Sequence, residues 1–419
     1  MNIRGLGACK RLFWGAAALT IGFSCLAATS APQQDGAGSA DSAGVRKAPK
    51  IAGSPEARLL AIYRLMADGD TRQALHQAEQ LVRDTPNFQL AQLVYGDLLA
   101  ARTRTLKSMG DIPGATSSFD TSVLTELKDE SQRRVAAAKE RHAEGTVPAQ
   151  FLKIAPQTRT AIAIDISRSR LYLFTNDASG LRLAADYYVS IGKAGTVKSQ
   201  EGDQRTPLGV YFITSNLDPK ALNEFYGAGA MPLNYPNILD IKRGKSGSGI
   251  WLHGTPQQQF SRAPRSTDGC LVLSNPDIVA LIRRVSVGDT PVVVASQLVW
   301  KPVGQLQTQA KPFESALSAW RDAKAAGDLN KVRAFYTTDF SSNGKTLDQY
   351  LPQIKSEMKA INRHHVQLKD LSYLHWNDSA ETMVTTFGEV VDGQRTGKRK
   401  RQYWIRSNNG WQIFFEGVL

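Results

Sequence analysis

One cysteine and one histidine carry the strongest chemical signal in the sequence. His253 closes the apolar run Trp251-Leu252, and Cys270 follows seventeen positions later, directly after Gly269. A cysteine nucleophile needs a base for the thiol proton, a group that orients this base, and donors for the developing oxyanion. His253 can supply the base, and the carbonyl of Gly254 can accept from its other ring nitrogen. Gly269 lets the backbone turn so that N–H groups point at the oxyanion. The pattern therefore predicts a cysteine nucleophile with a histidine base.

The count of cysteines bears on this hypothesis. The chain holds Cys9, Cys25 and Cys270. Residues 1–31 combine a basic start, an uncharged apolar run from Leu12 to Leu26 and small residues at the end, which is the layout of a secretory signal peptide. Cleavage there leaves Cys270 as the single thiol in an oxidising compartment, without a partner for an internal disulfide. Such a thiol is either a buried apolar side chain or a nucleophile. A retained N-terminal anchor is the alternative interpretation of residues 1–31.

Charge and histidine spacing narrow the range of partners. The net charge is +13, and it falls to +10 without residues 1–31. A basic exported protein is attracted to anionic surfaces, so we expect it in the periplasm of a Gram-negative envelope. The sequence has no basic stripe interleaved with aromatic residues, which argues against nucleic-acid binding. The six histidines do not stand with cysteines or carboxylates at metal-ligand spacing, so we expect neither a metal nor another cofactor.

The N-terminal part beyond residue 31 reads as a linker followed by helices. Residues 32–54 are rich in Gly, Ala, Ser and Pro, which is typical of a flexible linker. Residues 55–150 have helical periodicity, and the spacing of Ala74, Ala78 and Leu81 resembles a tetratricopeptide-type hairpin. Only one repeat is visible, so a plain helical pair is an equal alternative. We expect this region to bind envelope partners.

Two further regions follow. Residues 158–297 are rich in short apolar runs between long polar loops, which predicts a mainly β domain. Its predicted strands are 161–166, 171–174, 181–191, 209–213, 250–252 and 291–294. A connection at 301–311 leads into the last region, residues 310–419. Its predicted helices are 313–326, 330–336 and 350–361, and its predicted strands are 366–374, 381–391, 399–407 and 411–418. Helices followed by a curved antiparallel sheet resemble the cone-shaped NTF2-like fold, so the predicted fold class is multidomain α+β.

The residues around His253 and Cys270 resemble a known family. His-Gly-Thr, a loop of about 16 residues and Ser/Thr-x-Gly-Cys form the signature of the YkuD-type L,D-transpeptidase domain. Upstream, Thr206-Pro207-Leu208-Gly209-Val210-Tyr211 matches the Thr-Pro-x-Gly-x-Phe/Tyr element of that family. Asp165 and Leu171-Tyr172 are similar to its opening hairpin. The resemblance covers about 140 residues in three ordered motifs.

This resemblance implies a mainly β domain that acts on peptidoglycan stem peptides. Family members form a thioester with the meso-diaminopimelate of a tetrapeptide, release D-alanine, and pass the acyl group to an amine or to water. Carried over, Cys270 is the nucleophile, His253 the base and Gly254 the orienting carbonyl. The N–H groups of Asp268, Gly269 and Cys270 would form the oxyanion hole. We also expect His253 to lower the pKa of Cys270 and to make this thiol react quickly near neutral pH.

Four further residues are candidates for substrate binding. Arg262 and Arg265 lie in the loop before Cys270 and are expected to hold a substrate carboxylate. Thr267 belongs to the same loop. Tyr226, Tyr235 and the Gly-rich segment 227–229 are expected in a flap over the site, with an ordinary surface loop as the equal alternative. Solvated loop charges are the alternative interpretation of the two arginines.

The sequence departs from the family pattern at two positions, so more than one reaction is compatible with it. Asp268 stands where many members have His, and Val272 stands where many have Arg or Asn. The order of helical, catalytic and NTF2-like regions is similar to that of L,D-carboxypeptidases that set cell shape and use water as the acceptor. Transpeptidation is the first hypothesis, hydrolysis by an L,D-carboxypeptidase the second, and a non-catalytic envelope scaffold the third.

Overall fold

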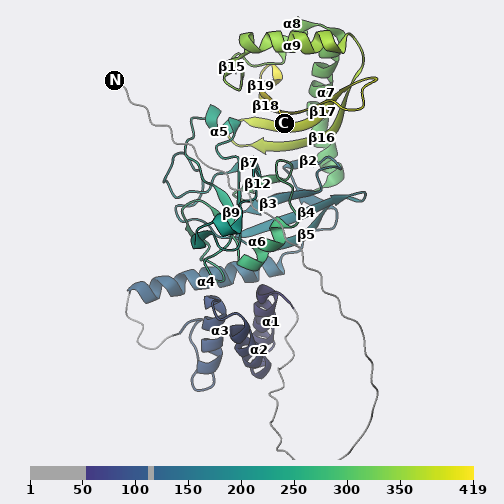
Figure 1. Ribbon diagram of the computed structural model, residues 1–419. Coiled ribbons are helices and arrows are strands. Elements are labelled where there is room, and N and C mark those ends of the chain that lie inside the picture. The colour runs from purple at the N-terminus through teal and green to yellow at the C-terminus, as the bar shows by residue number, and fades with distance from the viewer. Residues whose placement is uncertain (1–52, 112–117) are drawn as a thin grey trace, which may run out of the picture. The chain divides into compact units, whose positions relative to one another are not determined.

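A computed structural model of the protein describes residues 53–111 and 118–419 (Figure 1). The predicted signal peptide, residues 1–31, and all but the end of the predicted linker, residues 32–54, lie outside the described residues. Ala52–Leu419 form one compact unit. Within the described residues, no helix combines the length and the apolar character needed to cross a membrane.

Helices form the N-terminal part of the described chain. They are α1 (Pro55–Ala67), α2 (Thr71–Asp84), α3 (Gln89–Ala100) and α4 (Ser118–Lys139). The Ser54 side chain accepts from the Ala57 N–H at 3.2 Å and thereby caps α1, since the first N–H groups of a helix lack partners within it. The apolar faces of these helices share one core, which includes Leu59, Ile62, Ala74, Ala78, Leu81, Phe88 and Val94. The region predicted as helical up to residue 150 ends with a short strand, β1 (Thr146–Pro148).

A five-stranded sheet organises the middle of the chain, in the order β5-β4-β3-β12-β7. Its strands are β3 (Thr160–Asp165), β4 (Arg170–Asp177), β5 (Gly180–Tyr188), β7 (Gly209–Phe212) and β12 (Pro291–Ala295). β3 and β12 pair in parallel, and the other neighbouring strands pair antiparallel. Ile162 and Ile164 pack into the core on one face, whereas Ala161 and Ala163 pack into the core on the other. The continuous apolar runs in the sequence therefore come from a sheet that is covered on both faces.

A layer of short elements covers the face to which Ile162 belongs. It contains β6 (Ile191–Gly192), η1 (Pro219–Ala221), η2 (Glu224–Tyr226), β8 (Ala230–Pro232), β9 (Trp251–His253), β10 (Arg265–Thr267), β11 (Leu271–Val272) and α6 (Asn275–Ile282). The short helix α5 (Ile238–Lys242) packs on the other side, where Leu239 belongs to the core of Ala161 and Ala163. Strands β11, β9 and β8 form a three-stranded sheet, and β10 pairs with β6. Leu252 and Leu271 are fully buried against the residues of the central sheet, so this layer is fixed to the sheet by apolar packing.

The C-terminal region is an NTF2-like α+β cone. Its helices are α7 (Val303–Ala326), α8 (Leu329–Ala334) and α9 (Leu347–Ile361). Its antiparallel sheet runs β19-β18-β17-β16-β2, formed by β16 (Val366–Asn377), β17 (Glu381–Val391), β18 (Lys398–Ser407), β19 (Gly410–Val418) and β2 (Phe151–Lys153). Two short antiparallel pairs lie outside this sheet. β14 (Ser341–Ser342) pairs with β15 (Lys345–Thr346), and β13 (Trp300–Pro302) pairs with β1, which is far from it in the sequence.

Two features of this region differ from the sequence prediction. α7 begins at Val303, so most of the predicted connection 301–311 is helical, because Leu306 and Ala310 continue the buried stripe of Phe313. The edge strand β2 comes from the segment before the central sheet, and a strand of three residues leaves no periodic signal. The multidomain α+β fold class itself is confirmed.

The central sheet and the NTF2-like cone share one core. Phe174 and Val293 of the central sheet belong to the same apolar cluster as Trp320 and Trp404 of the cone. At this junction the Arg401 guanidinium lies 3.3 Å from the centre of the Phe212 ring. The cone therefore supports the second face of the sheet that carries the layer of short elements.

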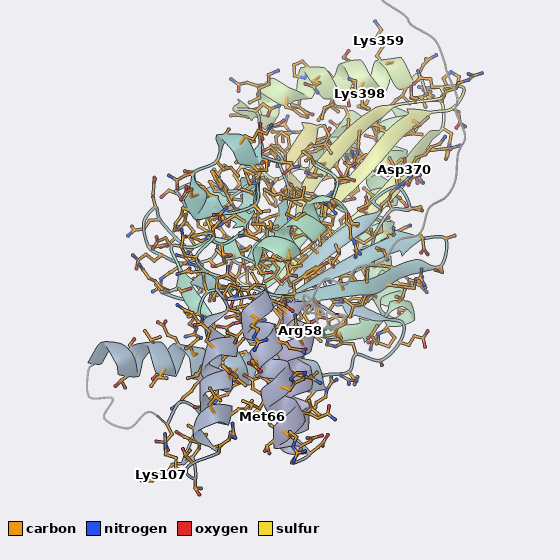
Figure 2. All side chains as sticks on the ribbon, turned by 60° about the horizontal axis from the view of Figure 1, so that its bottom comes forward. Arg58, Met66, Lys107, Lys359, Asp370 and Lys398 are labelled. Atoms are coloured by element: carbon orange, nitrogen blue, oxygen red, sulfur yellow. The ribbon has the colours of Figure 1, made fainter. Side chains whose placement is uncertain are left out.

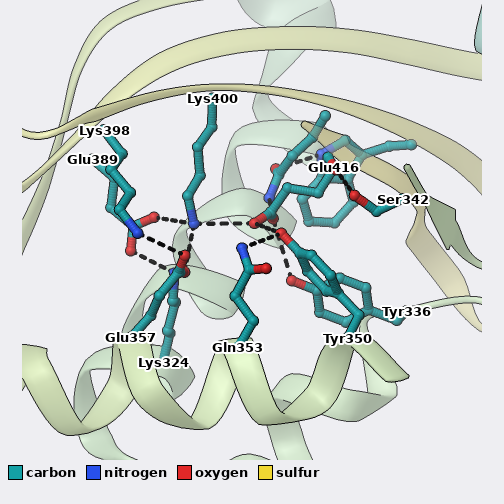
Figure 3. Close-up of polar contacts among 12 residues, drawn as sticks. Lys324, Tyr336, Ser342, Tyr350, Gln353, Glu357, Glu389, Lys398, Lys400 and Glu416 are labelled. Atoms are coloured by element: carbon teal, nitrogen blue, oxygen red, sulfur yellow. Dashed lines mark hydrogen bonds and ion pairs between the residues drawn. The ribbon is translucent and has the colours of Figure 1, made fainter. Parts of the chain in front are cut away.

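Buried charges lie inside the cone between α7, α9 and the sheet (Figure 3). The ammonium group of Lys324 lies 2.7 Å from Glu357 and 2.6 Å from Glu389. That of Lys400 lies 2.6 Å from Glu357, 2.8 Å from Glu389 and 3.0 Å from Glu416. Lys400 and Glu416 are 0% exposed, so each is stable in the interior only while the other ions neutralise it.

Lys400→Met is expected to lower the free energy of unfolding by about 3–5 kcal/mol, because the fully buried Glu416 forms its ion pair within the described chain with Lys400 and would lose it. Lys398→Met is the matched control, since Lys398 pairs with the same Glu357 at 3.5 Å from the outside of the cluster, with its own side chain 61% exposed (Figure 2). It should change stability by less than about 1 kcal/mol. Urea denaturation of both variants provides the measurement. Equal losses in the two variants would contradict a structural role for the buried cluster.

Candidate active site

The two residues that carry the chemical prediction lie on adjacent strands. β9 ends at His253, and Cys270 directly precedes β11. These strands pair in parallel, with Leu271 opposite Leu252 and Val272 opposite His253. This pairing brings together two residues that are seventeen positions apart in the sequence.

The turn before Cys270 is held by a buried threonine. Gly269 has φ +124°, and a Cβ atom at this position would lie 2.7 Å from the carbonyl oxygen of Arg205. Only glycine fits both constraints without strain. The Thr206 hydroxyl donates to the Gly269 carbonyl at 2.9 Å and accepts from the Gly192 N–H at 2.9 Å. The Thr-Pro-x-Gly motif therefore acts as a support for the nucleophile turn.

The predicted oxyanion hole needs one correction. The N–H of Gly269 donates to the Thr267 hydroxyl at 3.1 Å, so it is already engaged. The N–H groups of Asp268 and Cys270 donate to no atom of residues 53–111 or 118–419. Two of the three predicted donors are therefore available to an oxyanion.

His253 is poised as a neutral base. Its Nδ1 lies 2.7 Å from the carbonyl oxygen of Gly254. Because a carbonyl only accepts, Nδ1 carries the hydrogen and Nε2 is left as the basic atom. Burial lowers the pKa of His253 to about 4, against the opposing hydrogen bond to Gly254 and with help from the charge of Arg262. The imidazole is therefore neutral at pH 7.

The thiol of Cys270 is also neutral, which corrects the expectation of a lowered pKa. Burial raises its pKa, while the Trp251 N–H opposes this change and the Asp268 carboxylate adds to it. The half-buried thiol donates to the carbonyl oxygen of Gly249 at 3.2 Å. Desolvation disfavours charge on both partners, so a thiolate–imidazolium pair is not formed in advance.

An aromatic cover lies over the base. The ring of Phe225 is 5.8 Å from the imidazole of His253, and the ring of Tyr226 is 5.1 Å from it. The guanidinium of Arg262 lies 4.9 Å from the centre of the Phe225 ring. The half-buried Arg262 therefore lies beside the site.

The other three candidates for substrate binding differ from Arg262 in their surroundings. Arg265 is exposed and makes no hydrogen bond or ion pair through its side chain within the described chain. Thr267 is buried, and its hydroxyl donates to the carbonyl of Cys270 at 2.7 Å, so it shapes the turn. Tyr235 is 5% exposed in the core, and its hydroxyl donates to the carbonyl of Ser246 at 3.1 Å. Thr267 and Tyr235 are thus both buried, with their hydroxyls bonded to backbone carbonyls.

The sequence analysis missed the residue that fixes the aromatic cover. The Asn275 side chain accepts from the Ala228 N–H at 2.8 Å and donates to the Thr255 carbonyl at 2.8 Å. It therefore ties the segment after Tyr226 to the segment after His253. An Asn-Pro pair that opens a helix gives no sign of this role in the sequence.

Comparison with known proteins assigns the middle and the end of the chain. Residues 159–294 match YkuD, the L,D-transpeptidase catalytic domain, and residues 312–417 match the Cds6 C-terminal NTF2-like domain. The middle of the chain is thus similar to L,D-transpeptidase catalytic domains, and its C-terminal region is similar to an NTF2-like domain. No curated protein matches the chain.

Solved structures with a similar fold include two from bacteria. The structure of Bd1075 from Bdellovibrio bacteriovorus is 26% identical, with a TM-score of 0.55, over 65% of this chain and 98% of that chain. The helical cell shape determining protein Pgp2 from Campylobacter jejuni is 22% identical, with a TM-score of 0.48, over 62% of this chain and 91% of that chain.

Across residues 53–111 and 118–419, no group of three or more His, Cys, Asp and Glu side chains is arranged to hold a metal ion.

Iodoacetamide is expected to alkylate Cys270 slowly at pH 7, and the rate should rise with a midpoint above about 8.5, the ordinary pKa of a thiol. The reason is the burial that raises the pKa of Cys270. Glutathione in the same buffer is the reference thiol. Fast alkylation with a flat profile from pH 5 to pH 8 would instead indicate a preformed thiolate–imidazolium pair.

Thr206→Val is expected to lower the free energy of unfolding by about 1–3 kcal/mol, because it leaves the Gly192 N–H and the Gly269 carbonyl without their shared partner. Thr206→Ser keeps the hydroxyl and should stay within about 1 kcal/mol of the native protein. Urea denaturation compares the two. A valine variant as stable as the serine variant would show that the hydroxyl does not hold the turn.

Proposed function

We propose that the protein is a peptidoglycan L,D-transpeptidase that uses Cys270 to cleave the bond between meso-diaminopimelate and D-alanine in a tetrapeptide stem. The observation that carries this proposal is a neutral thiol and a neutral imidazole on adjacent strands, next to two N–H groups without an acceptor in the described chain. A nucleophile, a base and oxyanion donors are the parts that acyl transfer requires. They lie in a domain that matches L,D-transpeptidases.

The first half of the reaction forms a thioester. Nε2 of His253 takes the thiol proton as the sulfur of Cys270 attacks the carbonyl carbon of meso-diaminopimelate. The N–H groups of Asp268 and Cys270 stabilise the oxyanion that develops on this carbonyl. The imidazolium then gives its proton to the departing amine, so the C–N bond breaks and D-alanine leaves with a neutral amine and its carboxylate unchanged. The hydrogen bond from Nδ1 to the Gly254 carbonyl keeps Nε2 turned toward the reacting atoms.

The second half releases the acyl group. An amine of another stem peptide gives a proton to His253 and attacks the thioester carbon. The C–S bond breaks, and the thiolate of Cys270 recovers a proton from the imidazolium. The product is an amide between the two stems, and the resting neutral thiol and imidazole are restored.

Arg262 is the candidate for holding the substrate. Its guanidinium packs beside the Phe225 ring, next to His253. A guanidinium binds a carboxylate through two parallel hydrogen bonds, which orients the substrate as well as attracting it. The D-alanine of a tetrapeptide ends in a free carboxylate that suits this contact.

Water as the acceptor is the second candidate, and one position favours it. Val272 is 1% exposed, and its backbone exchanges hydrogen bonds with Ser190 at 3.0 and 2.9 Å. It offers no polar side chain to an acceptor amine where many family members have Arg or Asn. The protein would then be an L,D-carboxypeptidase that trims the tetrapeptide to a tripeptide.

Both reactions place the protein where peptidoglycan is built. The proposed signal peptide at residues 1–31 and the net charge of +10 that follows its removal suit an exported protein beside an anionic envelope.

Tetrapeptide muropeptides incubated with the native protein should yield free D-alanine together with 3→3 cross-linked dimers, detected by mass spectrometry. Cys270→Ala should abolish both products. His253→Gln should slow them by about 10²- to 10⁴-fold, the usual contribution of a general base. The thermal unfolding curves of both variants serve as the folding control.

The product pattern separates the two candidates. Tripeptide and D-alanine without dimers would overturn transpeptidation and support the carboxypeptidase. Intact tetrapeptide with the native, folded protein would contradict both and favour a non-catalytic envelope scaffold.

A further inference from the structure

The loop between His253 and Cys270 leaves its own domain and enters the core of the helical region. Phe260, in the middle of this loop, is 6% exposed and belongs to the apolar cluster of the helices. Its ring lies 4.3 Å from the ring of Phe88, which directly precedes α3. An aromatic residue at the tip of a 16-residue loop has thus become a core residue of another domain.

Backbone contacts fix the same part of the loop. The Phe260 N–H donates to the carbonyl of Asn87 at 2.9 Å, and the Asn87 side chain donates to the carbonyl of Gln257 at 2.8 Å. The next residue, Ser261, donates from its hydroxyl to Glu130 of α4 at 2.8 Å. The helical region therefore holds the loop on both its apolar and its polar side.

Glu130 is itself fixed by a buried ion cluster. Arg134 is 2% exposed and lies 2.8 Å from Glu130 and 2.8 Å from Glu56 of α1. Glu56 also lies 2.7 Å from Arg170 of the central sheet. The cluster therefore connects α1 and α4 to the domain that holds the active site.

The residue after Ser261 is Arg262, and its backbone is held from the other side. The hydroxyls of Tyr188 and Ser190 donate to the Arg262 carbonyl at 2.9 and 2.8 Å. Tyr188 is also stacked under Arg134, whose guanidinium lies 3.8 Å from the centre of the Tyr188 ring. The Arg262 side chain then reaches Phe225 beside His253. A chain of direct contacts therefore runs from the helical core to the guanidinium at the active site.

We propose that the helical region positions Arg262 over the active site, and that Phe260 is the positioning residue through which it does so. A free loop of this length samples many conformations, and anchoring its middle removes that freedom before the substrate arrives. The inference rests on the proposed role of Arg262 in binding a substrate carboxylate.

Two small reagents test the position of Arg262 without any stem peptide. Iodoacetate carries a carboxylate and iodoacetamide does not, so the ratio of their rates with Cys270 reports the guanidinium near the thiol. Arg262→Ala should lower this ratio about fivefold, as expected for a partly exposed charge pair. Phe260→Ala should lower it to the same extent. The double variant should fall no further, because Phe260 acts through Arg262.

Matched variants separate positioning from general damage to the helical core. Leu81→Ala removes a residue that is 0% exposed in the same cluster, from α2, which forms no hydrogen bond with the loop in the described chain. It should keep the native ratio. Phe260→Leu keeps an apolar anchor and should restore most of it. If Phe260→Ala does not fold, Asn87→Ala combined with Ser261→Ala removes the polar anchors without opening a cavity and should lower the ratio about twofold.

The outcomes distinguish this inference from the proposed function. A native ratio in the folded Phe260→Ala protein, or an equal fall in Leu81→Ala, would overturn the positioning role. A different result is that the native protein fails to turn over tetrapeptides while Phe260→Ala still lowers the alkylation ratio. That result would leave the positioning role in place and contradict only the proposed function. With active protein, Phe260→Ala should raise KM for the tetrapeptide by about fivefold and change kcat less, since the lost contact is to bound substrate.

Discussion

The protein depends on a central sheet that must be buried on both faces. Its strands place alternate side chains into two separate cores, one below the layer that holds the active site and one shared with the NTF2-like cone. Without the cone, the face that carries Phe174 and Val293 would be open to water, at a cost of about 25 cal/mol for each Å² of apolar surface. The short strands β9 and β11 have few hydrogen bonds of their own, so their register depends on this support. The NTF2-like region is therefore part of the frame of the catalytic domain.

Burial also sets the chemistry of the site. β9 and β11 are buried, and this burial lowers the pKa of His253 and raises the pKa of Cys270. The resting site therefore holds a neutral thiol beside a neutral base and needs no counter-ion in the core. In the proposed mechanism, charge develops only when a substrate carbonyl lies beside the N–H groups of Asp268 and Cys270.

One buried ion cluster connects the helices to the central sheet, and a second lies inside the NTF2-like cone. Glu56, Glu130 and Arg134 join the helices to the loop and to Arg170 of the central sheet, while Lys324 and Lys400 hold three carboxylates inside the cone. Buried ions are weak sources of stability, since their desolvation offsets much of their attraction. They do constrain the positions of the segments that carry them, however, because a misplaced segment would leave a buried charge unpaired. The first cluster lies next to the active-site loop, where geometry matters most.

The sequence by itself determined the fold class, most strands of the two sheets, and the pairing of His253 with Cys270 across a Gly-containing turn. These are local signals: the period of apolar residues, the need for glycine at positive φ, and motif spacing. Only the tertiary structure decided the rest. The protonation of Cys270 and His253 depends on desolvation by distant segments. The Gly269 N–H is not free for an oxyanion, because it donates to the Thr267 hydroxyl. Phe260 looked like an ordinary loop residue because its partners, Phe88 and Asn87, lie about 170 positions away in the chain. Long-range packing, which no local pattern encodes, turned that loop into the link between the helices and the active site.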